Sequence, residues 1–195
     1  MSRVKELEGQ LEHTEQQLRL VQQISRFMAR DMSLAEAFQA VVSLVVEFMD
    51  CDSCLLYLLE QKELVLCASN SPRPDTIGKV RLKLGEGLTG RVARERRLLS
   101  ISKEAYLDPR FKHFSDLPED NYEAFLSAPV ILRNRVAGVI NVQHRDQHFH
   151  TGGEMELLTT VGEQVGCLVA LAAADLSALE SGNIFDLVMA PARRT

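Results

Sequence analysis

The sequence lacks the features that mark membrane, exported and nucleic-acid-binding proteins. No stretch of its 195 residues reaches the roughly 18–20 consecutive apolar residues of a membrane helix. The segment Met1–Glu8 is polar and lacks the apolar core of a secretion signal. The net charge is −5, whereas a nucleic-acid-binding face is basic. We therefore expect a cytoplasmic protein with neither membrane nor nucleic-acid partners.

Common catalytic motifs are also missing. The sequence has no nucleophile elbow, zinc-protease helix or phosphate-binding loop. The acidic residues Glu119, Asp120 and Asp146 have no partner at a recognisable spacing. We therefore expect no enzyme, no catalytic residue and no cofactor. An enzyme whose residues meet only in space stays open as an alternative, because catalytic triads are defined by geometry rather than by order along the chain.

Cysteine is scarce, with four residues in the chain. Cys51 and Cys54 have C-x-x-C spacing, but no second ligand pair follows at zinc-finger distance. His144, His148 and His150 fall where a strand end and a loop are expected, so we expect no metal site there. Buried thiols in apolar strands are the ordinary interpretation. A thiol-based redox sensor or enzyme using Cys51 and Cys54 is kept as an alternative.

The composition is that of an ordinary globular protein, with 46% hydrophobic and 25% charged residues. The length favours one domain with extensions. We expect an N-terminal dimerisation helix over residues 1–30, a main domain with its C-terminal helix over 31–175, and a helix end and tail over 176–195.

The N-terminal helix carries apolar residues at alternating spacings of three and four. This heptad seam comprises Val4, Leu7, Leu11, Thr14, Leu18, Val21, Ser25 and Met28. A helix of about 27 residues spans about 40 Å, which is more than one small domain can cover. The pattern therefore predicts that the helix pairs as a coiled coil or helical bundle, most simply in a homodimer. A helix packed only on its own domain is the alternative.

The remaining pattern predicts an α+β fold. A second helix begins at Ser33, with Glu36 completing a capping box. A short helix runs to Arg96, and a last helix opens at Gly153 or Glu154. Strands are expected at 53–59, 63–69, 80–84, 98–101, 125–132 and 136–143. Mostly hairpin connections favour a six-stranded antiparallel sheet, and Gly138 suggests a close backbone approach.

Three runs of sequence resemble the GAF domain. They are Leu82–Ala93 (LKLGEGLTGRVA), Ser127–Ile131 (SAPVI) and Val136–Gln143 (VAGVINVQ), followed by Phe149 and Glu154. The order and spacing are similar to bacterial GAF domains at the N-terminus of nitrogen-branch phosphotransferase enzyme I and of sensor kinases. The resemblance implies terminal helices on one face of the sheet, as in profilin-like folds, and a small-molecule pocket on the other. It also implies that Gly85 and Gly87 are turn residues.

Specialised branches of the family fit the sequence poorly. The cyclic-nucleotide subset has a Lys after the asparagine, where this chain has Val142, and an Asp before the glutamate, where it has Gly153. The bilin-binding subset needs a cysteine in the long loop, and residues 102–124 contain none. The methionine sulfoxide reductases use loop and strand cysteines, whereas three of the cysteines here fall in or beside the first hairpin.

The long polar segment 102–124 is the best candidate for a ligand lid, because loops of this length often have a binding role. It mixes apolar walls with a few polar groups, and Arg110 is suited to an anionic group. The candidate ligand-binding residues are Asp108, Arg110, Phe111, His113, Phe114, Tyr122, Phe125, Ser127, Asn141 and Gln143. The alternative is that Phe111 and Phe114 only anchor the loop to the sheet.

Together these patterns predict a sensory or regulatory domain that binds an unknown small molecule and signals as a homodimer. Its terminal helices would pass the change to an effector domain or protein. A structural dimerisation and interaction module without a ligand is the main alternative.

Overall fold

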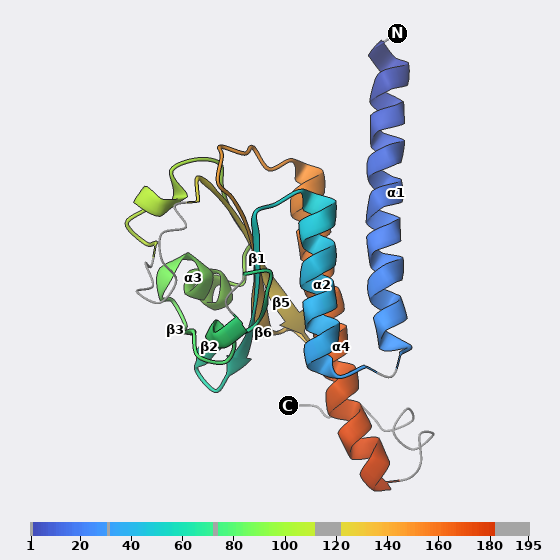
Figure 1. The fold of residues 1–195 in the computed structure, drawn as a ribbon, viewed down its shortest axis with the longest axis vertical. Helices are drawn as coiled ribbons and strands as arrows, with labels where there is room; N and C mark the ends of the chain where they lie inside the picture. The colour runs from blue at the N-terminus through green and yellow to red at the C-terminus, as the bar shows by residue number, and fades with distance from the viewer. Residues whose placement is uncertain (1, 31, 72–73, 112–121, 182–195) are drawn as a thin grey trace.

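The computed structural model describes residues 2–30, 32–71, 74–111 and 122–181. Its centre is a six-stranded, fully antiparallel sheet in the order β3-β2-β1-β6-β5-β4. The strands are β1 (Ser53–Glu60), β2 (Glu63–Ser69), β3 (Arg81–Lys83), β4 (Leu99–Ile101), β5 (Ala124–Leu132) and β6 (Arg135–His144). Figure 1 shows α1, α2 and α4 on one side of this sheet and α3 on the other. The predicted α+β class and strand count are confirmed.

Pairing between β1 and β6 joins the first hairpin to the last. Gly138 of β6 lies opposite Leu58, and a Cβ atom at Gly138 would stand 2.1 Å from the carbonyl oxygen of Tyr57. The predicted close backbone approach is therefore confirmed. The β5–β6 turn consists of Arg133 and Asn134, both with positive φ, as the twist of a two-residue hairpin requires.

Helices α2 (Leu34–Met49) and α4 (Gly152–Ser181) cover one face of the sheet, and α1 (Ser2–Met28) packs on the outside of these two helices. The alternation of each strand turns one set of apolar side chains toward them. These include Leu56, Leu126, Val130, Ile140 and Val142, which pack with Val41, Val42, Leu158 and Val161. This helix-side core is the main hydrophobic core of the domain.

The start of α2 is fixed by the predicted capping box. The Ser33 hydroxyl accepts the Glu36 backbone N–H, and the Glu36 carboxylate accepts the Ser33 backbone N–H at 2.9 Å. The start of α4 differs slightly from expectation. It begins at Gly152, one or two residues before the predicted Gly153 or Glu154, because Thr151 and Glu154 form the same reciprocal bonds.

Helix α4 lies very close to β5. A Cβ atom at Gly166 would stand 2.5 Å from the carbonyl oxygen of Ile131, and one at Gly162 would stand 2.9 Å from that of Pro129. Within the described residues, one helix is long and apolar enough to cross a membrane, namely Gly152–Ala172 of α4. Its buried residues Leu158 and Val161 pack in the helix-side core.

The opposite face carries α3 (Gly87–Glu95) and short 3₁₀ turns at Pro74–Thr76 and Ala105–Leu107. The turn before α3 uses Gly85 and Gly87, both with positive φ, a conformation that glycine adopts without steric cost. The Glu86 carboxylate accepts the Lys83 backbone N–H at 2.8 Å. This turn ends β3 at Lys83, so the strand is shorter than the predicted 80–84.

Candidate ligand site

The α3 face of the sheet brings several of the predicted site residues together. Ser127 lies directly opposite Asn141, and Phe125 directly opposite Gln143, on the paired strands β5 and β6. All four side chains are buried. Strand alternation places them on the side away from the helix-side core. Alternation along one strand predicts that Asn141 and Gln143 share a face, and the pairing with β5 adds Phe125 and Ser127 to it.

A chain of hydrogen bonds crosses this face. The Ser127 hydroxyl donates to Asn141 Oδ1 at 2.7 Å, and Asn141 Nδ2 donates to Thr89 Oγ1 at 2.8 Å. Thr89 comes from the first turn of α3, so the asparagine ties the helix to two strands. An amide group has two donors and two lone pairs, so these bonds leave Asn141 one N–H and one lone pair.

Thr89 was missed by the sequence reasoning. It lies inside the run Gly85–Gly90, where the glycines drew attention as turn residues. The available signal was its neighbourhood: Leu88, Thr89 and Gly90 are buried together at the start of α3. A polar residue next to an apolar one at a buried helix start needs an internal hydrogen-bond partner.

An apolar wall stands beside the polar chain. Phe125 is buried with Leu88 and Ala105, and Phe111 packs against this group. Tyr122, just before β5, is also buried. Phe111 therefore anchors its segment to the sheet, as one of the two predictions for it stated. His113 and Phe114 lie outside the described residues.

Asp108 and Arg110 pair with each other beside this wall. The Asp108 carboxylate accepts hydrogen bonds from the backbone N–H of Arg110 at 2.8 Å and from its Nε at 2.7 Å. These bonds lower the pKa of Asp108 to about 2. The guanidinium group was predicted to suit an anionic group, and in this structure Asp108 is that group.

The cysteines are poorly placed for redox chemistry. Cys51 and Cys54 are buried at the base of β1, and Cys54 belongs to the helix-side core. Burial raises the pKa of Cys51 to about 12 and that of Cys54 well above its usual value. Since the thiolate is the reactive form, both groups are unreactive thiols at neutral pH.

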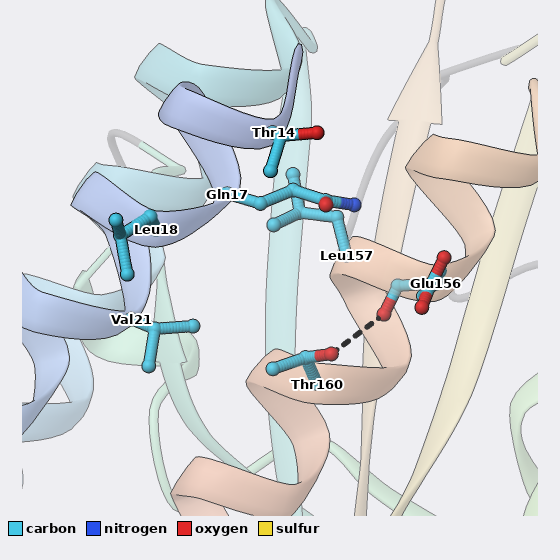
Figure 2. Close-up of a pocket in the computed structure, with 7 residues that line it drawn as sticks. All are labelled: Thr14, Gln17, Leu18, Val21, Glu156, Leu157 and Thr160. Atoms are coloured by element: carbon cyan, nitrogen blue, oxygen red, sulfur yellow. Dashed lines mark hydrogen bonds between the residues drawn. The ribbon is translucent and has the colours of Figure 1, made fainter. Parts of the chain in front are cut away.

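A hollow of about 260 Å³ lies between α1 and α4, on the helix side of the sheet (Figure 2). Gln17 donates a hydrogen bond across it to the backbone carbonyl of Gly153 at 3.3 Å. The lining residues are Thr14, Gln17, Leu18 and Val21 of α1 with Glu156, Leu157 and Thr160 of α4. Three of them, Thr14, Leu18 and Val21, belong to the heptad seam, so the hollow borders that seam rather than the predicted ligand site.

An antiparallel six-stranded sheet with the longer helices on one side and the short helix α3 on the other defines a two-sided α+β domain. The family model for the GAF domain matches residues 33–169. The chain therefore belongs to the GAF domain family.

Among solved structures, the GAF domain from a phosphoenolpyruvate-protein phosphotransferase of Coxiella burnetii has 28% identity and a TM-score of 0.76, over 84% of this chain and 98% of that one. A phosphoenolpyruvate-dependent phosphotransferase system protein of Escherichia coli K12 is 27% identical over 139 residues, which is 70% of this chain. The chain spans only 18% of that relative's length. The resemblance to phosphotransferase GAF domains is thus confirmed.

A third structure shares the fold alone. The free methionine-R-sulfoxide reductase of Neisseria meningitidis superposes with a TM-score of 0.68 at 14% identity, over 82% of this chain and 91% of that one. The fold therefore accommodates a catalyst as well as a regulatory domain, and the distinction depends on the residues of the site.

Proposed function

We propose that this chain is a regulatory domain that acts as a homodimer, joined along the heptad seam of α1. The observation that carries the proposal is that α1 has two apolar faces. Leu20 and Ile24 are buried in the helix-side core, with Phe27 packed against it. Val4, Leu7, Leu11 and Leu18 of the seam are instead 56–61% exposed.

The two apolar faces of α1 lie nearly opposite each other. At about 100° per residue, positions 20, 24 and 27 project roughly half a turn away from positions 4, 11 and 18. The domain's own packing therefore leaves the seam uncovered. In Figure 1 the N-terminal half of α1 extends past the sheet and its other helices. A second copy of the same helix offers a matching heptad surface.

The proposed dimer includes α4 at one end. Leu18 and Val21 line the hollow against α4, and Leu171 farther along α4 is also exposed. A change in the sheet can then alter the pose of α1 and α4, which an effector domain or protein senses. The phosphotransferase relatives support an effector of that kind, acting in the cytoplasm.

The dimer is tested by the double variant Leu7→Glu with Leu11→Glu. Sedimentation equilibrium is expected to give twice the 21.8 kDa chain mass for the unmodified protein and a single chain mass for the variant. Charges at seam positions are costly to bury, so the dimer dissociation constant should rise at least about 100-fold. Arg19→Glu with Arg26→Glu is the matched control, because these exposed positions lie off the seam. An unmodified protein that sediments as one chain contradicts the proposal.

A second proposal, of a small-molecule site on the α3 face, is supported by the buried Asn141 chain. Asn141 keeps one donor and one acceptor beneath a segment that also brings Phe111 to the sheet. A thermal-shift screen with metabolites tests it, since a ligand of the native state raises the melting temperature. A compound that stabilises the unmodified protein but not Asn141→Ala supports the site. Equal shifts in both proteins place binding elsewhere, and then the module acts without this site.

A further inference from the structure

Three histidines meet at the junction between the sheet and the last helix. His144 is the final residue of β6, and His148 and His150 lie in the connection to α4. The rings of His144 and His148 stack with centroids 4.1 Å apart, and the His150 ring lies 5.0 Å from His148 and 5.5 Å from His144. One ligand nitrogen from each residue lies within 4.8 Å of the others.

Two of these side chains hold unsatisfied nitrogen atoms. Within the described part of the chain, His144 Nε2 and His150 Nε2 are buried without a hydrogen-bond partner. Their residues are only 6% and 7% exposed. A buried polar atom without a partner is costly, and one explanation for such an atom is an ion that it binds.

The second ring nitrogen of His150 has a hydrogen-bond partner. His150 Nδ1 lies 3.0 Å from the Ser100 hydroxyl. If Nδ1 carries the proton and donates it to that oxygen, the lone pair of Nε2 is free for a ligand.

His148 is oriented by a carboxylate. Its Nε2 lies 2.7 Å from Glu154 Oε1, while Glu154 Oε2 accepts the backbone N–H of Thr151 in the capping box of α4. A carboxylate that holds the far nitrogen of a metal-bound histidine is the usual outer-shell arrangement, and it leaves the other nitrogen to bind. Glu154 thereby links His148 to the first turn of α4.

We propose that His144, His148 and His150 bind one divalent transition-metal ion, with zinc as the probe. Imidazole nitrogen suits zinc, copper, nickel and iron, whereas magnesium and calcium take oxygen ligands. Three protein nitrogens leave a fourth position open for water or another small ligand. The site goes beyond the regulatory role proposed above and does not depend on the dimer.

The ring positions indicate how the site closes. Tetrahedral zinc with bonds of 2.0–2.1 Å holds its donor atoms about 3.3 Å apart. The three histidine nitrogens now lie within 4.8 Å of one another, so they must move closer together to bind one ion. His148 is the partly exposed member, with 35% of its side chain accessible. Its ring turns out of the stack on His144, while the two buried rings move little. Metal binding then fastens β6 to the start of α4.

The test is zinc binding by the chelator-treated full chain. Equilibrium dialysis followed by elemental analysis is expected to give one zinc ion per chain. His148→Ala should weaken the affinity at least tenfold, and this variant is preferred because its side chain is the least buried of the three. Zinc should also raise the melting temperature of the unmodified protein but not of the variant. Glu156→Ala, which removes an exposed acidic side chain of α4 outside the cluster, is the matched control and should retain full affinity.

The same experiment distinguishes zinc bound by histidines from zinc bound by thiols. Cys51→Ala with Cys54→Ala should leave zinc binding intact, and cobalt bound to the unmodified protein should give visible d–d bands without thiolate charge-transfer absorption. Far-ultraviolet circular dichroism confirms that each variant is folded. The proposal is overturned if the unmodified chain binds no zinc at micromolar free concentration. Unchanged zinc affinity in folded His148→Ala, or loss of zinc binding with the cysteines, overturns it as well.

Discussion

Two buried polar residues on opposite faces of β6 differ in whether their side chains have hydrogen-bond partners. Asn141 points to the α3 face, where Ser127 and Thr89 satisfy it. His144, three residues later, keeps Nε2 buried without a partner among the described residues. Period-two alternation predicts that Asn141 and Gln143 share a face. It gives no information on how the three histidine rings converge, because that depends on the path of the connection to α4.

The cysteines give a prediction at this scale. Cys167 is exposed on α4, whereas Cys51 and Cys54 are buried and their pKa values are raised by burial. In the native protein at pH 8, a thiol reagent such as dithionitrobenzoate should modify Cys167 at least about 100-fold faster than Cys51 or Cys54, because accessible thiolate controls the rate. Mass spectrometry of tryptic peptides assigns each rate.

The control for this measurement is the denatured chain, in which all thiols should react at similar rates. Fast modification of Cys51 or Cys54 in the folded protein would restore the redox alternative. Slow modification of Cys51 and Cys54 would indicate that they serve as packing residues in the helix-side core and at the base of β1.

At the scale of elements, local signals predicted most helices and strands. Capping boxes fix the starts of α2 and α4, and the heptad seam predicted the whole of α1. Errors occur where a side-chain contact between residues three positions apart decides a boundary. β3 ends early because Glu86 closes the turn after Lys83, and the Thr151 cap moves the start of α4. Such contacts leave no periodic trace in the sequence, although Thr151 and Glu154 have the spacing of a capping box.

The packing of α4 on β5 gives a prediction for an element. Replacing Gly166 with Val puts a branched side chain where a Cβ atom alone would lie 2.5 Å from the Ile131 carbonyl oxygen. Overpacking of this kind should lower the free energy of unfolding by about 2 kcal/mol. Urea denaturation followed by circular dichroism measures the change. Gly9→Val is the matched helical control, since Gly9 has open space around it, and it should change stability by less than about 0.5 kcal/mol.

At the scale of the whole molecule, the order β3-β2-β1-β6-β5-β4 brings together strands far apart in the sequence. Hairpin spacing predicted β1–β2 and β5–β6, but it contains no signal for the pairing of β1 with β6. The resemblance to the GAF domain implied a six-stranded antiparallel sheet, but it was not used to predict this pairing. The β5–β6 hairpin places Asn141 opposite Ser127, whereas the bond from Asn141 to Thr89 of α3 joins residues far apart in the sequence. The sequence therefore predicted the strand part of the candidate site but not its contact with α3.

The last prediction separates the domain from its proposed dimer contact. Removing residues 1–16 deletes Val4, Leu7 and Leu11 of the seam but keeps Leu20 and Ile24, which belong to the helix-side core. The truncated chain should therefore fold with an unchanged near-ultraviolet circular dichroism spectrum and sediment as a single chain. Its melting temperature should no longer rise with protein concentration, whereas that of a full-length dimer should. A truncated chain that still sediments as a dimer would show that the interface lies on α4. A truncated chain that fails to fold would show that the first half of α1 belongs to the domain core.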